Sequence, residues 1–245
     1  MATRAKSYEE LKPLVQLCKT GHLFEVQAWI ADGRPVDPPV HKGGRRTKNP
    51  LEVAIAQGSH SLVLVLLKGG ATISDNSYNA LEQALAECRV DLIRLLVEYG
   101  ADLASVDMVS VFDSWDPEIM EYCIEQGGDV ETDSPLAVAL CDRVRTALGV
   151  FKRHQDQFPS FQEQLNTALR FHCREGDLKW VSLLLWAGAD PFAKGVGAPG
   201  EEPEPDPDDE LCALEYAALY DHLEICKLKK IKIAPDHPIA YELVR

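Results

Sequence analysis

Apolar residues recur along most of this chain in short groups spaced three or four residues apart. In residues 79–102 (NALEQALAECRVDLIRLLVEYGAD) they fall at positions i, i+3, i+4 and i+7 in two successive segments that meet near Cys88. This spacing is typical of amphipathic helices that bury one face. The pattern therefore predicts two short helices joined by a turn over residues 79–102.

The same two-helix pattern recurs from one end of the chain to the other. Gly70, Gly100 and Gly188 follow the last turn of a unit, where a left-handed residue commonly ends a helix. Each helix pair has more apolar face than it can bury alone, so we expect neighbouring pairs to stack and share one core. The sequence predicts a single domain over residues 1–245, with repeats at 12–33, 49–73, 79–102, 106–130, 134–155, 167–190 and 212–234.

The expected helix starts carry capping signals. Asn49 precedes Pro50, which needs no amide partner in a first turn, and Glu52 follows three residues after the cap; Asn79 and Glu82 repeat this spacing. Small residues recur one turn into the first helix of several units, where we expect neighbouring units to pack closely; they are Ala54, Ala84, Ala139 and Ala217.

These segments resemble ankyrin repeats. The family's Thr-Pro-Leu-His opening is similar to residues 49–52, 134–136 and 167–169, although Glu replaces the His at 52, 82 and 215. The family sequence that links the two helices of a repeat is similar to residues 221–226. The family's Gly-Ala-Asp ending is similar to the ends of residues 96–102 and 184–190. The resemblance covers residues 12–234 and implies an all-α ankyrin-like repeat solenoid of about seven helix–turn–helix units. A solenoid of HEAT-like helix pairs is the alternative fold, and the Gly-Ala-Asp endings argue against it.

The spacing of the repeats is irregular. The residues that close the first helix of each unit are 21, 58, 88, 115, 143, 176 and 221, so the intervals are 37, 30, 27, 28, 33 and 45 residues. The short central intervals predict that the β-hairpins between neighbouring helix pairs, called hairpin fingers, are short or missing there. The long outer intervals hold a basic insertion, 34–48, and an acidic proline-rich insertion, 193–210, which we expect to be loops. They are either arms that contact a partner or simple solvated insertions.

The resemblance also indicates a partner-binding surface. It implies that the positions just before each closing residue face a concave groove; they are Gln57, Glu87, Asp113, Asp142, Glu175 and Tyr220. Further candidates lie at the finger bases and in the basic insertion; they are Tyr78, Leu211, Lys42, Arg45, Arg46 and Lys48. An exposed Tyr78, Leu211 or Tyr220 would suit an anchor, because binding energy concentrates in such residues.

Charge narrows the class of partner. The formal net charge of −14 arises beyond residue 100, since residues 1–100 hold 12 basic and 11 acidic side chains. An acidic surface repels phosphate backbones and attracts basic proteins, so we expect a protein partner with a basic surface and no direct nucleic-acid binding. No run of 18 apolar residues or apolar signal core occurs. The seven cysteines include no C-x-x-C pair, so we expect them to be small core residues of a chain in a reducing compartment. We expect a cytoplasmic chain that is monomeric alone and does not enter membranes.

The sequence lacks the patterns of common catalytic, cofactor and metal sites. Residues 195–200 match G-x-G-x-x-G, but prolines and acids follow them in place of a helix, and no histidine pair has metal-ligand spacing. We interpret His172 as a satisfied core histidine and place Trp29, Trp180 and Trp186 mostly in the core, with Trp115 at a helix junction.

These observations predict a protein–protein interaction module and not an enzyme, with no catalytic residues, cofactor or metal. The resemblance implies that such a module acts as an inhibitor, an immunity-type neutraliser or a scaffold. Two alternatives remain. One is an acidic mimic of nucleic acid that inhibits a DNA- or RNA-binding protein. The other is an enzyme or small-molecule binder that uses the irregular centre, residues 104–160.

Overall fold

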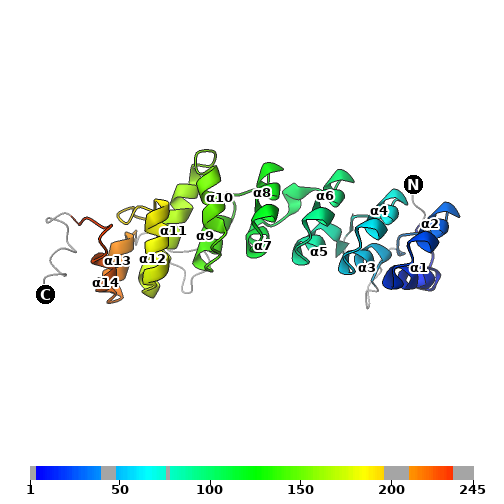
Figure 1. The fold of residues 1–245 in the computed structure, drawn as a ribbon, viewed down its shortest axis with the longest axis horizontal. Coiled ribbons are helices and arrows are strands. Elements are labelled where there is room, and N and C mark those ends of the chain that lie inside the picture. The colour runs from blue at the N-terminus through cyan, green and yellow to red at the C-terminus, as the bar shows by residue number, and fades with distance from the viewer. Residues whose placement is uncertain (1–3, 40–47, 76–77, 196–209, 234–245) are drawn as a thin grey trace. The chain divides into compact units, whose positions relative to one another are not determined.

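The computed structural model describes residues 4–39, 48–75, 78–195 and 210–233. Within these ranges the chain forms fourteen α-helices in seven consecutive pairs, which confirms the predicted helix–turn–helix architecture (Figure 1). The helix pairs belong to two compact units. Unit 1 comprises residues 1–106 and 125–128, and unit 2 comprises residues 107–124 and 129–245.

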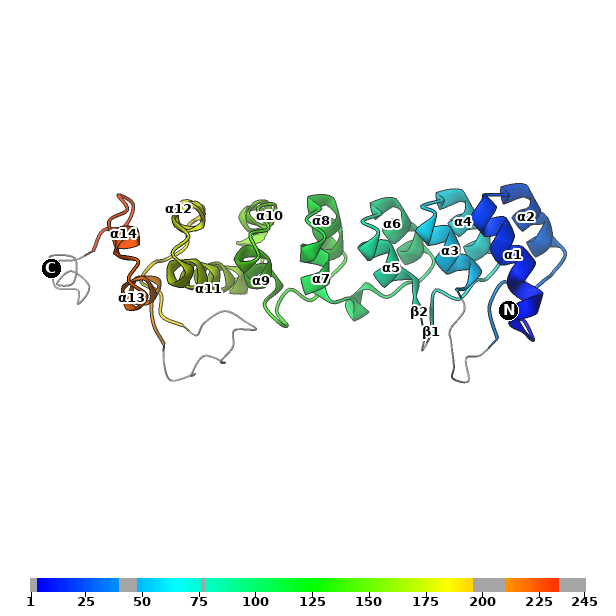
Figure 2. The same ribbon diagram turned by 90° about the horizontal axis from the view of Figure 1, so that it is seen from below.

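Unit 1 consists of three stacked helix pairs. The first helices of the pairs contact one another in the order α1, α3, α5, and the second helices do so in the order α2, α4, α6 (Figure 2). Their bounds are α1 Tyr8–Thr20, α2 Leu23–Ala31, α3 Pro50–Ala56, α4 His60–Lys68, α5 Ala80–Ala86 and α6 Val90–Glu98. A 3₁₀ turn, η1 at Leu103–Ser105, follows α6.

Unit 2 contains four more pairs. Its first helices contact one another in the order α7, α9, α11, α13 and form a row. The second helices, α8, α10, α12 and α14, all lie on the same side of this row (Figure 2). Their bounds are α7 Met108–Asp113, α8 Pro117–Glu125, α9 Pro135–Cys141, α10 Ala147–His154, α11 Ser160–Glu175, α12 Leu178–Ala187, α13 Ala213–Leu219 and α14 Leu223–Cys226. Every first helix therefore packs against the first helix of a neighbouring pair in its own unit.

Small buried residues allow the first helices to approach closely. Ala54, Ala84, Ala139 and Ala217 are all at most 4% exposed, as their position one turn into each helix predicts. The carbonyl oxygen of each accepts the N–H of the residue five positions later, in the turn that ends the helix. In the sixth pair the same carbonyl belongs to His172, which accepts the N–H of Asp177, so a large polar side chain occupies a position that four other pairs give to alanine.

The seven residues predicted to close the first helices share one backbone conformation. All have φ between +50° and +74°; three are glycines, and the other four are Cys88, Trp115, Arg143 and Asp221. This left-handed region is strained for residues other than glycine, by about 1 kcal/mol or more. The tight turn between the two helices of a pair is therefore strained wherever a residue other than glycine occupies the closing position.

Replacing Cys88 with glycine should stabilise the protein. The substitution removes the strain at φ +50°, offset in part by the greater freedom of glycine in the unfolded chain, so we expect a net gain of about 0.5 kcal/mol in the free energy of unfolding. Urea denaturation measures this gain. Cys88→Ala is the control, because alanine keeps the strained Cβ; an equal gain in both variants would show that the thiol, and not the backbone, is responsible.

One hairpin finger is present among the described residues. Strands β1 (Ser74–Asp75) and β2 (Tyr78–Asn79) pair antiparallel between the second and third helix pairs. The described segments between α6 and α9 contain no strand, which agrees with the short fingers expected in the centre. Asn79 then caps α5, its side-chain oxygen accepting the N–H of Leu81 at 3.0 Å, while Asn49 caps α3 through the N–H of Glu52 at 2.5 Å.

The start of the predicted basic loop, residues 34–48, is packed against the repeats. Pro35, Val36 and Asp37 are buried, and the Pro35 carbonyl accepts the indole N–H of Trp29 at 2.9 Å. The carboxylate of Asp37 accepts both the N–H and the hydroxyl of Thr72, at 2.9 and 2.5 Å. This segment therefore joins the first two repeats instead of extending into solvent.

Two other predictions about burial are wrong. Trp186 is 67% exposed instead of lying in the core, because it sits on the solvent side of α12 with the Lys152 ammonium 3.2 Å from its ring centroid. Cys88 is exposed at the tip of a turn, whereas the other six cysteines are buried, and no disulfide joins any of the seven, all of which lie in the described ranges. Among the described residues, no helix is long and apolar enough to cross a membrane.

Candidate functional site

The six residues predicted to form one surface row all lie where a first helix ends. Four of them cap their helix at its C-terminal end, and Asp113 and Glu175 are the last residues of α7 and α11. The four caps are Gln57 on α3, Glu87 on α5, Asp142 on α9 and Tyr220 on α13. All six are exposed. Unit 1 carries Gln57 and Glu87, and unit 2 carries the other four.

The acidic members of this row occupy an electrostatically unfavourable place. The C-terminal end of a helix carries a partial negative charge, so a carboxylate there typically destabilises the helix by about 0.3–1 kcal/mol. No ion pair or hydrogen bond of the Asp113 or Asp142 side chain occurs with the rest of the described chain. Their charges are therefore left for solvent or for a ligand.

The nearest basic residue in sequence does not neutralise Asp142. Arg143 turns away through its left-handed backbone, and its Nε donates to Oδ2 of Asp177 at 3.0 Å, one repeat further on. Burial would raise the pKa of Asp177, but hydrogen bonds from the Trp180 N–H and from Arg143 hold that pKa below its ordinary value of 3.8. Asp177, and not Asp142, therefore binds the guanidinium of Arg143.

A similar arrangement occurs in unit 1, whereas Glu175 differs. Arg89 follows Glu87 by two residues, yet it forms a bidentate pair with Asp91 at 2.9 and 2.8 Å. Glu175, in contrast, lies 3.2 Å from the guanidinium of Arg174. The row thus has uncompensated carboxylates at Glu87, Asp113 and Asp142, and a compensated one at Glu175.

A cavity of about 210 Å³ opens between α7 and α9 in unit 2, beside two of these carboxylates. Its lining residues are Val109, Ser110, Asp113, Val138, Ala139, Asp142 and Val144. Drug-sized ligands usually occupy about 300–1,000 Å³, so this cavity is too small for such a molecule. It lies within the irregular centre, and it combines apolar walls with two acidic groups.

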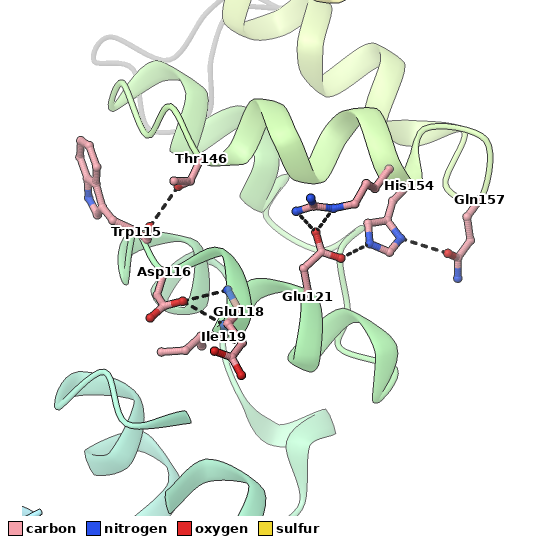
Figure 3. A network of polar contacts seen from close by, with 9 residues as sticks. Trp115, Asp116, Glu118, Ile119, Glu121, Thr146, His154 and Gln157 are labelled. Carbon is pink, nitrogen blue, oxygen red and sulfur yellow. Dashed lines mark hydrogen bonds and ion pairs between the residues drawn. The ribbon is translucent and has the colours of Figure 1, made fainter. Parts of the chain in front are cut away.

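Trp115, which was expected only at a helix junction, is a further candidate. Its side chain is 50% exposed and points away from the α7–α8 turn, two residues after Asp113 (Figure 3). The backbone is held at φ +59°, and its carbonyl accepts the Thr146 hydroxyl at 3.1 Å. A bulky residue is unusual in this conformation. The signal in the sequence was a tryptophan at a position where other repeats have glycine.

The fourth and fifth helix pairs are tied together by an ion-pair network on their second helices (Figure 3). Glu121 of α8 accepts from Arg153 Nε at 2.6 Å and lies 2.6 Å from His154 Nε2, both on α10. Gln157 lies 3.1 Å from the other ring nitrogen of His154. These contacts and the Thr146–Trp115 hydrogen bond hold α7 and α8 beside α9 and α10, where the described segment contains no hairpin finger.

The remaining predicted site residues have mixed surroundings. Tyr78 is half-buried and its hydroxyl donates to Gln83 at 2.6 Å, so this group serves the fold. Leu211 is half-buried and forms an isolated antiparallel bridge with Gly195, and Lys48 is exposed before α3. Lys42, Arg45 and Arg46 lie outside the described residues. The helix-end row, in contrast, is exposed at every position.

Comparison with known proteins identifies the fold. The human ASB11 ankyrin repeat domain superposes with a TM-score of 0.61 and 18% identity, covering 91% of this chain and 99% of that domain. The chain has the ankyrin-repeat fold. The ankyrin repeat domain of Bcl-3, described as a unique member of the IkappaB protein family, gives a TM-score of 0.60 and 20% identity, covering 87% of this chain and 98% of that one.

The repeats of this chain are divergent in sequence. No family model matches the sequence, and no curated protein is significantly similar to it. The predicted all-α repeat architecture is nevertheless confirmed, since two ankyrin repeat domains match most of the chain. The divergence agrees with the four closing positions that lack glycine and with the unequal repeat spacing.

Proposed function

We propose that this ankyrin-repeat chain is a protein-binding module that docks a basic partner on the carboxylates at the ends of its first helices. The observation that carries the proposal is the pair Asp113 and Asp142, which are exposed, unpaired among the described residues and placed at the negative ends of their helices. A stable fold gains nothing from this arrangement, whereas a cationic partner would relieve it.

Exposed apolar side chains near this row support a protein partner. Trp115 follows Asp113, and Leu219 and Tyr220, 67% and 51% exposed, end α13 in the same unit. Tryptophan and tyrosine are enriched among residues that dominate interface energy. Helices already ordered before binding lose little conformational entropy on docking. Occupation of the partner's basic surface would inhibit, neutralise or localise it, and we propose that the chain acts in one of these ways inside the cytoplasm.

Neutralising the two aspartates should weaken partner binding. We expect Asp113→Asn/Asp142→Asn to reduce capture of a stoichiometric partner from an extract of the source organism, and to lower its association rate and the salt dependence of that rate. Pull-down with mass spectrometry identifies the partner, and surface plasmon resonance at two salt concentrations measures its kinetics.

The matched control is Glu125→Gln/Asp156→Asn. Glu125 ends α8 and Asp156 follows α10; both are exposed, and the substitutions change the net charge equally. Loss of binding in the aspartate variant alone supports the proposed surface. Equal loss in both variants would show that only the total charge matters, and full binding by the aspartate variant would place the partner elsewhere.

A further inference from the structure

The cavity between α7 and α9 has the chemistry of a socket for one cationic side chain. Val109 and Val138 belong to facing first helices, and with Ala139 and Val144 they form apolar walls. Asp113 and Asp142 also line it, each at the C-terminal end of its helix. Lysine and arginine match this pattern, because they bury an aliphatic stem against apolar surface while the charged head stays among polar groups.

The size of the cavity agrees with this occupant. About 210 Å³ exceeds the space of a few waters, each of about 30 Å³, and falls short of that for a drug-sized ligand. The nearby cation, Arg143, does not fill the role, since its Nε is bonded to Asp177. Ser110 also lines the cavity, but its hydroxyl is engaged by Asp107 at 2.7 Å. The carboxylates of Asp113 and Asp142 are the groups left for a ligand.

We infer that this cavity receives a single lysine or arginine side chain of the partner protein, with the aliphatic stem against Val109 and Val138 and the cationic head between Asp113 and Asp142. The inference rests on the proposed function and deepens it, because it specifies an anchor residue on the partner. A surface of diffuse negative charge would attract basic proteins without distinguishing one side chain. The cavity would fix the register of the partner on the repeat.

An NMR titration tests the socket without knowledge of the partner. The probes are Nα-acetyl-lysine methylamide and Nα-acetyl-arginine methylamide at millimolar concentration, with the norleucine analogue as the uncharged control of similar shape. We expect saturable shifts of the backbone amides of Ser110, Val138 and Ala139 with a cationic probe, and binding about tenfold weaker for norleucine, because the charge-assisted hydrogen bond is lost. Equal shifts from norleucine, or no shifts from either cation, would overturn the inference.

Two variants separate charge from shape. Asp113→Asn/Asp142→Asn should weaken binding of the cationic probe about tenfold, whereas Glu125→Gln/Asp156→Asn should leave it unchanged. Val138→Phe keeps both carboxylates but fills the mouth of the cavity, since Val138 is half-buried there, and it should abolish the shifts. Well-dispersed spectra of each variant establish that it is folded.

The Val138→Phe variant also separates this inference from the proposed function. If it binds the lysine probe as the wild type does, the socket is wrong, even where the natural partner still requires Asp113 and Asp142. If the partner binds independently of both aspartates while the probe still enters the cavity, the proposed function is wrong and the cavity serves another ligand.

Discussion

The protein should lose stability between pH 7.5 and pH 5, and His172→Gln should remove most of that loss. His172 is fully buried in α11, stacked on Trp180 with ring centroids 5.3 Å apart. Its Nε2 lies 2.9 Å from the Leu140 carbonyl, which can only accept, so Nε2 carries the proton. Nδ1 has no hydrogen-bond partner, and Oδ2 of Asp177 lies 4.0 Å away. The predicted core histidine is therefore satisfied at one ring nitrogen only.

The direction of the effect follows from the pKa of His172. Burial lowers this pKa below its ordinary value of 6.5, and Arg143 adds to the lowering, while the Leu140 hydrogen bond and the charges of Asp177 and Glu175 oppose it. Below pH 6.5 the unfolded chain binds a proton at this residue that the folded chain does not yet accept. Stability is thus complete above about pH 7.5 and falls as the pH drops through 6.5, with a slope of at most 1.36 kcal/mol per pH unit.

Urea denaturation at pH 7.5, 6 and 5 measures this dependence. We expect the wild type to lose up to about 2 kcal/mol over the interval. The aspartates whose pKa values are lowered, such as Asp177, titrate below this range, so they do not contribute to the change in the free energy of unfolding. His60→Gln removes an exposed histidine of unit 1 and should keep the loss. An unchanged pH dependence in His172→Gln would mean that the buried ring is not its source.

Gly176→Ala should destabilise the protein by about 2–5 kcal/mol, for two separate reasons. Gly176 has φ +71°, where a Cβ introduces backbone strain of about 1–2 kcal/mol. The new Cβ would also lie 2.5 Å from Cε1 of His222, in the turn of the next repeat. Displacing that ring adds an overpacking cost of about 1–3 kcal/mol, which urea denaturation should reveal.

Gly21→Ala provides the matched control for Gly176→Ala. Gly21 has φ +74° at the corresponding end of α1, but no atom lies within 4 Å of a Cβ placed there. Its replacement should therefore show the backbone strain alone. In a His222→Ala background, Gly176→Ala should fall to the same value. Equal effects of the two glycine substitutions in the natural sequence would show that the contact with His222 has no energetic role.

The sequence predicts the helix pairs well because each depends on local information. Hydrophobic spacing locates the helices, and the residues predicted to close the first helices all adopt the left-handed conformation, including Cys88, Trp115 and Arg143. A single turn geometry ends each first helix, so its place in the pattern decides the conformation even where glycine is absent. Alanine at positions such as 84 and 139 likewise indicated close packing that the structure confirms.

Contacts between repeats were harder to predict, because they depend on side chains far apart in sequence. The ammonium of Lys152 lies over the ring of Trp186, which is 34 residues away in sequence. The carboxylate of Asp37 accepts a hydrogen bond from Thr72, which is 35 residues away. The pairing of Arg143 with Asp177 was equally hidden, although it leaves the neighbouring Asp142 uncompensated. The row of residues at the ends of the first helices could be predicted from the sequence. Which of its carboxylates lack an ion-pair partner, and the cavity beside them, could be found only from the structure.

Carboxylate footprinting tests the central claim most directly. The chain, free and bound to its captured partner, is treated with a carbodiimide and glycine ethyl ester, and modification is quantified residue by residue with mass spectrometry. We predict that the partner protects Asp113 and Asp142 while Glu125 and Asp156 react equally in both states. Protection of Glu125 and Asp156, with Asp113 and Asp142 still reactive in the complex, would contradict the proposal that the carboxylates at the ends of the first helices form the binding surface.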